Sequence, residues 1–172
     1  MPDPTERVLA LDPSLRGTGF AILERRQRQI AALDFGVIRN PASLLQSQCL
    51  VVIHEKIRGL LSEWTPGCMA VESVIYVQSY RTAITLGAAR ASAILAAAQS
   101  AVPVFEYAPR RVKQAVVGAG SAQKAQVAFM VRALLKLTET PPPDAADALA
   151  IGLTHFQSSD ASAVRRTIPP RI

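Results

Sequence analysis

Three strand-like segments open the chain before any helical pattern begins, and this order limits the folds that the chain can adopt. Apolar residues dominate 7–12, 20–25 and 30–38, and the second and third segments are joined by the polar stretch "RRQRQ", as in a hairpin. A helical period follows over 41–64, with Ser43 as its expected N-cap, as Ser121 is for the later helix that begins there. The stretch "GCMAVESV" after the first of these helices indicates a short strand after a Pro-Gly turn. The first strand, followed by two antiparallel strands joined in a hairpin, predicts an open sheet.

The second half of the chain completes this order with helices and one more strand. We expect a long alanine-rich helix over 79–100, a strand over 102–107, helices over 109–118 and 121–137, and a last helix from Asp144 to about Phe156. The whole order predicts an α/β protein of ribonuclease H-like architecture, in which helices flank a five-stranded mixed sheet. We expect one domain over 1–157 and a basic, mobile tail over 158–172.

Composition narrows the class of protein. The chain has 172 residues, of which 49% are hydrophobic and 19% charged, which argues for one folded domain and against disorder. No apolar run approaches the roughly 20 residues of a membrane-spanning helix, and the polar start "MPDPTERV" is no secretory signal. Cys49 and Cys68 are too few for a disulfide framework. We therefore expect a cytoplasmic protein without a membrane partner.

Four carboxylates stand at the ends of predicted elements. Asp12 and Glu72 each end an apolar strand, and Asp144 and Asp147 lie three residues apart on one side of a helix. In the predicted architecture these acids meet at one sheet edge, where they repel each other unless cations lie among them. Mg²⁺ and Mn²⁺ prefer oxygen ligands, and two such ions are a known means of breaking phosphodiester bonds. The sequence therefore predicts metal-dependent cleavage of nucleic acid.

Basic residues fall in the same half of the chain as the aspartate pair. They include Arg110, Arg111, Lys113 and Lys124, and cations beside an acidic cluster suit phosphates held next to metals. The net charge of +6 also favours a polyanionic partner, although composition alone fits a basic protein without nucleic acid equally well.

Each of these features has a structural alternative when it is taken alone. Asp12 precedes a proline and suits a turn, and the aspartate pair suits the start of a helix because of the helix dipole. The alanine-rich helix can pack in its own core, which the sequence alone slightly favours, or against a partner. Tyr76 can stack on an opened base or lie partly buried in its loop. His54 and His155 are interpreted as structural residues.

Four stretches together resemble the RuvC Holliday-junction resolvases, from about Arg7 to Phe156. They are "LALDPSLRGTGFAIL", "AVESVIYVQSYRTAITLGAAR", "VPVFEYAPRRVKQAVVGAGSAQKAQV" and "DAADALAIGLTH". The resemblance implies that 1–157 is a RuvC-like nuclease domain that acts as a homodimer. Such enzymes cut four-way DNA junctions with symmetrical nicks in two strands of like polarity, beside a branch-migration motor of the RuvA–RuvB type.

The resemblance also implies roles for particular residues. Asp12, Glu72, Asp144 and Asp147 would be the catalytic ligands of two Mg²⁺ ions per site, for which Mn²⁺ can substitute. Lys113 and Lys124 would lie near the scissile DNA, with Arg110, Arg111, Ile75 and Tyr76 as further DNA contacts, and the helix from about Ser79 would form the dimer. Two positions depart from the usual family pattern: Ser14 replaces a glycine, and Ile75 replaces a phenylalanine that contacts the crossover.

Two other functions stay open at this point. A ribonuclease H-type hydrolase acting on another nucleic acid would share the four acids but would not need a dimer. A non-catalytic junction-binding module would keep the acids for stability and use its basic groups only to hold DNA. Loss of activity on chelation separates an enzyme from a binder, and substrate choice separates the two enzymes.

Overall fold

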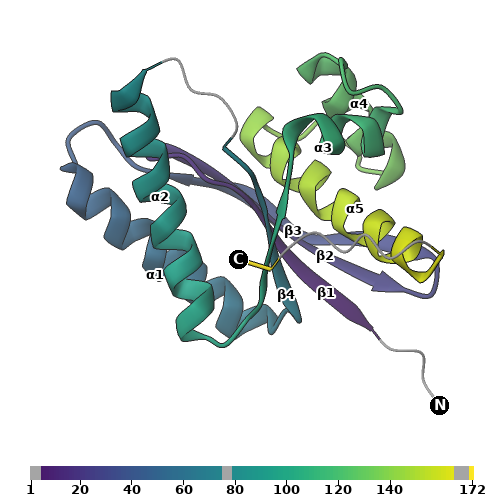
Figure 1. Cartoon of the computed structure of the whole chain (residues 1–172), viewed down its shortest axis with the longest axis horizontal. Coiled ribbons are helices and arrows are strands. Elements are labelled where there is room, and N and C mark those ends of the chain that lie inside the picture. The colour runs from purple at the N-terminus through teal and green to yellow at the C-terminus, as the bar shows by residue number, and fades with distance from the viewer. Residues whose placement is uncertain (1–4, 75–78, 165–170) are drawn as a thin grey trace.

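A twisted central sheet lies between two layers of helices (Figure 1). The computed structural model describes residues 5–74, 79–164 and 171–172, except for the side chains of 160–164. The strands are β1 (Glu6–Asp12), β2 (Gly17–Arg26), β3 (Gln29–Arg39), β4 (Cys68–Glu72) and β5 (Val104–Tyr107). They lie in the order β3-β2-β1-β4-β5, with the first three antiparallel and β4 and β5 parallel to β1. The predicted five-stranded mixed sheet is confirmed.

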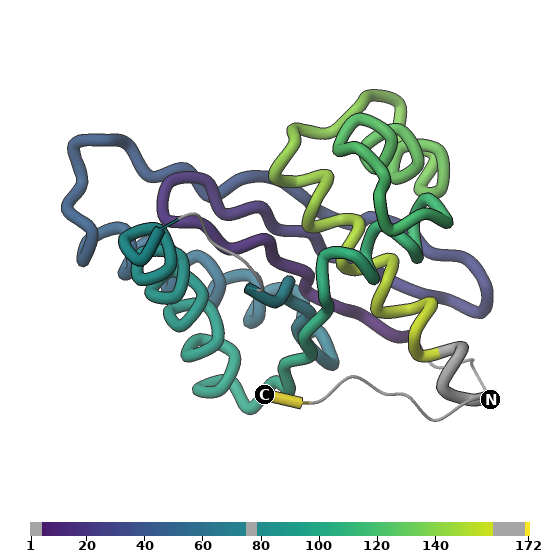
Figure 2. The backbone as a smooth tube through the Cα atoms, turned by 45° about the horizontal axis from the view of Figure 1, so that its top comes forward, coloured from purple at the N-terminus to yellow at the C-terminus, as the bar shows by residue number. Residues whose placement is uncertain are grey.

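The helices are divided between the two faces of this sheet. They are α1 (Gln46–Trp64), α2 (Tyr80–Gln99), α3 (Pro109–Val117), α4 (Lys124–Leu134) and α5 (Pro143–Val164). Helices α1 and α2 cover one face, and α3, α4 and α5 cover the other, as Figures 1 and 2 show from two directions. Because side chains alternate along a strand, β1 supplies Val8 and Ala10 to the α5 side and Leu9 and Leu11 to the α1–α2 side. The central strand is thus buried on both faces.

Helix starts follow the sequence in some places and not in others. Ser79 caps α2, since its hydroxyl accepts a hydrogen bond from the backbone N–H of Thr82 at 3.2 Å. Expected caps at Ser43 and Ser121 are wrong, because α1 begins after Leu45 and α4 after Gln123. In both helices a glutamine three residues after the cap accepts from the cap's backbone N–H, at 2.8 Å. A glutamine side chain, and not a serine hydroxyl, therefore forms a hydrogen bond with the backbone at the start of α1 and of α4.

The C-terminal part of the chain differs from the expectation in one respect. Helix α5 continues to Val164 instead of ending near Phe156, so the first residues of the predicted tail are helical. At the end of the chain Arg171 forms an antiparallel bridge with Phe105 of β5, and the N–H of Ile172 donates to the carbonyl of Val104 at 3.2 Å. The division at residue 157 stays a prediction. None of the helices in the described part of the chain is long and apolar enough to cross a membrane.

Candidate active site

The four predicted acids belong to three elements that meet at one edge of the sheet. Asp12 is the last residue of β1 and Glu72 the last residue of β4, and these two strands are parallel neighbours. Parallel strands end at the same edge, so both carboxylates emerge there. Asp144 and Asp147 lie in the first two turns of α5, which packs across β1 and β2. The predicted gathering at a sheet edge follows from this topology.

Two glycines of β2 allow the start of α5 to reach this edge. A Cβ atom built on Gly19 would lie 1.9 Å from the backbone carbonyl oxygen of Asp144, which is far inside contact distance. A Cβ atom on Gly17 would lie 3.1 Å from the Oδ2 atom of the same aspartate. Gly19 is also the cross-strand partner of Asp12. The missing side chains therefore let α5 lie directly on β2, with the Asp144 carboxylate beside the end of β1.

The electrostatics of Asp12 show that the acids share one environment. Burial raises the pKa of Asp12 to about 7, and repulsion from Asp147, Glu72 and Asp144 adds to this, while the Lys124 ammonium opposes it. Burial also raises the pKa of Glu72, again with repulsion from Asp147 and with opposition from Lys124 and Lys113. Asp12 and Glu72 thus resist ionisation at this sheet edge.

The donor set of the cluster fits a hard divalent cation. Four carboxylates offer oxygen ligands of the kind that Mg²⁺ and Mn²⁺ prefer, and positive charge there would offset the repulsion that raises the pKa of Asp12. The Nζ atom of Lys124 donates to Oδ2 of Asp147 at 2.9 Å, so this lysine already contributes one positive charge. Across residues 5–74, 79–164 and 171–172, no three His, Cys, Asp or Glu side chains have the spacing of a formed metal site. Binding a metal ion among these acids would therefore require side-chain adjustment.

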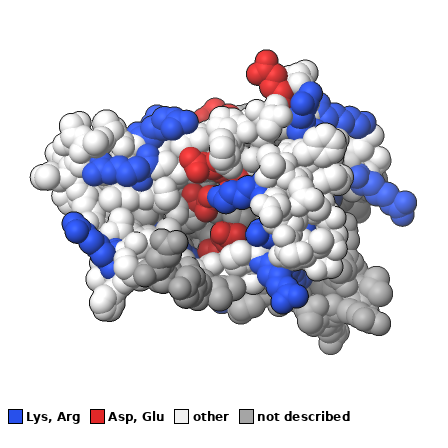
Figure 3. Space-filling view, turned by 90° about the horizontal axis from the view of Figure 1, so that it is seen from above, with Lys and Arg blue, Asp and Glu red and all other residues white. Residues whose placement is uncertain are grey.

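A hollow of about 350 Å³ opens beside Asp12 and Glu72. Its other walls are Pro13, Ser73, Val74, Leu86, Arg90, Pro109 and Arg110. Figure 3 shows acidic side chains in a hollow of this face, with Lys and Arg side chains around it. The arrangement can hold a phosphate between carboxylates that bind cations and basic groups that offset its charge.

The basic residues predicted from the sequence have different surroundings. Arg110 lines the hollow, Lys124 contacts Asp147, and Lys113 lies close enough to Glu72 to lower its pKa. Arg111 instead donates to the hydroxyl of Ser158 at 3.0 Å and lies over the ring of Tyr107 at 5.8 Å. Its position therefore supports the attachment of α3 to α5, and its DNA contact stays a prediction.

Of the remaining residues singled out in the sequence, Ile75 and Tyr76 lie outside the described residues, and Ser14 lies within them. Ser14, which departs from the usual glycine, closes the turn after Asp12: its hydroxyl accepts from the N–H of Gly17 at 3.1 Å, and its carbonyl accepts from the hydroxyl of Thr18 at 2.6 Å. The serine is thus accommodated without disturbing the β1–β2 connection.

The histidines have structural contacts, as predicted. His155 forms hydrogen bonds with the Sγ atom of Cys68 at 3.2 Å and with the hydroxyl of Tyr107 at 2.8 Å. His54 forms one with the side chain of Gln99 at 2.8 Å, which joins α1 to the end of α2.

Arg90 was missed by the sequence analysis. It lines the same hollow as Asp12 and Glu72, and its Nη2 atom contacts Oε1 of Glu106 at 2.8 Å. The available signal was an arginine in the middle of a helix rich in small residues, where a charge needs a partner.

Comparison with known proteins agrees with this geometry. The family model described as "Crossover junction endodeoxyribonuclease RuvC" matches residues 8–155. A protein of that name from Akkermansia muciniphila is 55% identical over 154 residues, covering 90% of this chain and 92% of the relative. Another from Klebsiella pneumoniae is 44% identical, covering 91% and 90%. The structure of Thermus thermophilus RuvC in complex with Holliday junction substrate superposes with a TM-score of 0.88 at 30% identity, covering 96% and 99%.

Proposed function

Because the chain belongs to the RuvC family of crossover junction endodeoxyribonucleases, we propose that it resolves four-way DNA junctions by metal-dependent nicks during recombination and repair. The family assignment also agrees with the predicted ribonuclease H-like fold and with a nuclease activity. The observation that carries the proposal is the position of four acids at one sheet edge: Asp12 and Glu72 end the parallel neighbours β1 and β4, and Asp144 and Asp147 lie at the start of α5, which packs directly on β2. Burial and the nearby acids raise the pKa of Asp12 to about 7, which agrees with this grouping. A site of this kind suits cations and an anionic substrate.

The four acids have the proposed role of metal ligands. Asp12, Glu72, Asp144 and Asp147 would hold two Mg²⁺ ions, and Mn²⁺ would serve in their place. When bound, such a pair of ions supplies the charge that activates a water molecule and stabilises the leaving 3′-oxygen. The acids themselves hold positions at the ends of β1 and β4 and at the start of α5, which are rigid elements.

The basic groups would hold the DNA strand against these acids. Lys124 stays protonated, because its hydrogen bond with Asp147 and the nearby acids raise its pKa. Its side chain is 79% exposed, so the ammonium can contact an incoming phosphate as well as Asp147. Arg110 and Lys113 both lie on α3: Arg110 lines the hollow, and Lys113 lies close enough to Glu72 to lower its pKa, so both would contact the same strand.

We propose a four-way DNA junction as the substrate and a homodimer as the assembly. A solved relative holds a Holliday junction, and a junction with two symmetrical cuts suits two identical sites related by a dimer axis. The outer face of α2 would form that dimer, since small residues there leave Ile84 and Leu95 exposed. We further propose that the dimer acts in the cytoplasm with a branch-migration motor of the RuvA–RuvB type.

Strand cleavage of a synthetic four-way junction tests the proposal. The junction would be compared with linear duplex and with RNA–DNA hybrid, each with Mg²⁺ and with EDTA. We expect paired nicks that are confined to the junction and absent with EDTA. Binding without any cleavage would support a non-catalytic junction-binding module, and cleavage of the hybrid alone would support a ribonuclease H-type hydrolase.

A further inference from the structure

Arg90 lies in the middle of α2 and borders two hollows of the molecule. One is the hollow beside Asp12 and Glu72, and the other is a groove along α2 that includes Leu95 and Ala98 and reaches Glu106 of β5. The arginine side chain is only 18% exposed. A guanidinium this deeply placed needs a compensating charge, because an unpaired buried cation is costly.

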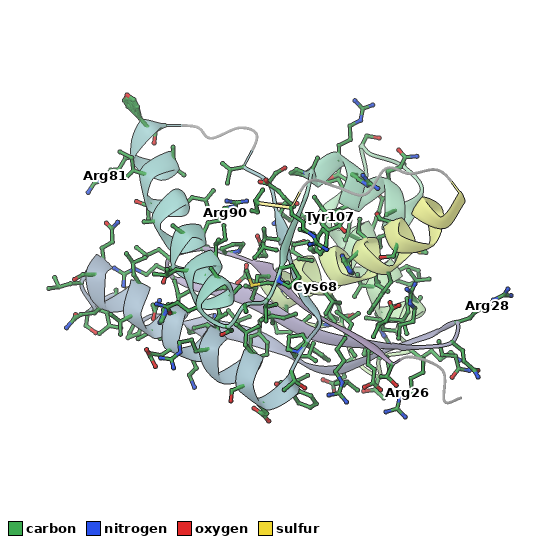
Figure 4. All side chains as sticks on the ribbon, turned by 60° about the horizontal axis from the view of Figure 1, so that its bottom comes forward. Arg26, Arg28, Cys68, Arg81, Arg90 and Tyr107 are labelled. Carbon is green, nitrogen blue, oxygen red and sulfur yellow. The ribbon has the colours of Figure 1, made fainter. Side chains whose placement is uncertain are left out.

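Glu106 of β5 supplies this compensation. Its Oε1 atom lies 2.8 Å from Nη2 of Arg90, and its side chain is 25% exposed. The Nε atom of Arg90 is buried and has no hydrogen-bond partner among the residues that the structure describes. Figure 4 shows Arg90 extending from α2 toward the sheet edge. The ion pair is therefore the polar attachment of this side chain, and removing either partner leaves the other as an uncompensated charge.

The ion pair joins α2 to a strand that is next to the site. In the parallel pairing of β4 with β5, Glu106 lies opposite Val71, and the following pair joins Glu72 to Tyr107. The chain then enters α3 at Pro109, which lines the hollow together with Arg110. Glu106 thus lies near two residues of the site: Glu72, a proposed metal ligand on the neighbouring strand β4, and Arg110, a proposed DNA contact on α3.

We propose that Arg90 is a positioning residue, whose ion pair with Glu106 holds α2 against β5 and thereby sets the separation of Glu72 and Arg110 across the hollow. Arg90 acts through Glu106 and does not contact DNA. The inference rests on the proposed cleavage reaction, in which the acids must be in register with the phosphate. It also connects the helix with the proposed dimer face to the strand pair that carries Glu72.

A set of charge variants tests this role. R90Q and E106Q each remove one charge, R90E/E106R exchanges the two, and R90K keeps the positive charge as a milder variant. The control is R58Q, which breaks an exposed pair with Glu55 on α1 at 3.7 Å. For each protein the measurements are kcat and KM on a four-way junction, Mn²⁺ affinity by calorimetry, and the melting temperature.

The positioning role predicts a particular pattern. R90Q and E106Q should each lower kcat by about 10- to 100-fold and weaken Mn²⁺ binding by about tenfold, with junction KM changed by less than about twofold. R90E/E106R should recover part of both losses, R90K should keep most of kcat, and R58Q should match the unmodified protein.

Three results would separate this role from its rivals. If R90Q raised the junction KM while E106Q did not, Arg90 would contact DNA and the inference would be overturned. If both variants lost activity only in proportion to a lower melting temperature, with Mn²⁺ affinity unchanged, the pair would serve stability alone and the inference would again fail. An unmodified protein that cuts no junction would overturn the proposed function, and the Mn²⁺ affinities would still decide the positioning role.

Discussion

At the residue scale, Asp12 interacts electrostatically with all three other acids of the site. Its carboxylate is repelled by Asp147, Glu72 and Asp144, and cations bound among these acids would remove that repulsion. We predict that D12N lowers junction cleavage by at least about 1,000-fold, since a metal ligand supports several kcal/mol of transition-state stabilisation. Junction binding should be kept or strengthened because a negative charge is lost. Cleavage and gel-shift assays with Mg²⁺ measure the two effects.

The matched control for D12N is D34N. Asp34 lies on β3 and lines a separate hollow with α1, so this variant makes the same change of charge away from the four acids. It should cut junctions at the normal rate. A D12N protein that cuts as fast as D34N would rule out Asp12 as a metal ligand.

His155 makes a different residue-scale prediction, which concerns stability. Burial lowers its pKa from 6.5 to about 4; nearby, Glu6 opposes this shift and Arg25 adds to it, while Cys68 and Tyr107 bond to the ring. Because the unfolded chain binds a proton below pH 6.5 and the folded chain does not until about pH 4, stability falls as pH falls through this window. We predict that His155 accounts for a loss of about 2 kcal/mol between pH 7 and pH 5.

Urea denaturation of the unmodified protein and H155Q at both pH values measures this contribution. H155Q will be less stable at pH 7, because it loses the bonds to Cys68 and Tyr107. The decisive quantity is the change between the two pH values, which should be smaller in H155Q by about 2 kcal/mol. Equal changes in the two proteins would mean that His155 is not kept neutral by its surroundings.

At the scale of elements, the contact of α5 with β2 places half of the acids. A methyl group on Gly19 would meet the backbone of Asp144, which cannot move without moving the start of α5. We predict that G19A lowers the free energy of unfolding by about 1–3 kcal/mol and lowers cleavage even where the protein stays folded. Gly59 is the control, because a Cβ there meets nothing within 4 Å.

G59A should have the opposite effect on stability. Gly59 is exposed in the interior of α1, where alanine is favoured over glycine by about 0.8–1 kcal/mol. Chemical denaturation and junction cleavage would be measured for both variants. A G19A protein with normal stability and activity would show that α5 does not need this close approach.

The elements themselves could largely be predicted from the sequence. The alternation of a strand and the period of a long helix can be read from residues that are close in sequence. All five strands and the helix after Ser79 were therefore predicted near their observed bounds. The starts of α1 and α4 could not be predicted in this way. Ser43 and Ser121 are good caps by residue type, yet the side chains of Gln48 and Gln126, in the first turns of α1 and α4, form the hydrogen bonds with the backbone at the helix starts. Local propensity does not decide between such competing partners.

At the scale of the whole molecule, the acids were predictable and their neighbours only in part. Asp12 and Glu72 each end an apolar strand, which indicates their position without knowledge of packing. Arg110 and Arg111 were predicted together, but successive residues point about 100° apart on a helix, so only the first lines the hollow. The partner of Arg90 is set by the packing of α2 against β5, which no local pattern indicates.

The proposed dimer yields the prediction that involves the whole assembly. The outer face of α2 exposes Leu95 beside a groove formed with Gly87, Ala91 and Ala98, which lets another helix approach closely. We predict that L95E makes the protein monomeric, because a buried unpaired carboxylate is costly at such an interface. On a supercoiled plasmid with an extruded cruciform, the dimer should release linear DNA and L95E only nicked circles, since two cuts need two sites.

Sedimentation equilibrium and the plasmid products would be measured for L95E and for V51E. Val51 on α1 is 61% exposed, against 53% for Leu95, so V51E introduces the same charge at a similarly exposed apolar position on another helix. V51E should stay dimeric and produce linear DNA. If L95E also stayed dimeric and made paired cuts, the outer face of α2 would not be the interface. If L95E were monomeric but still produced linear DNA, coordination of the two cuts would not depend on the dimer.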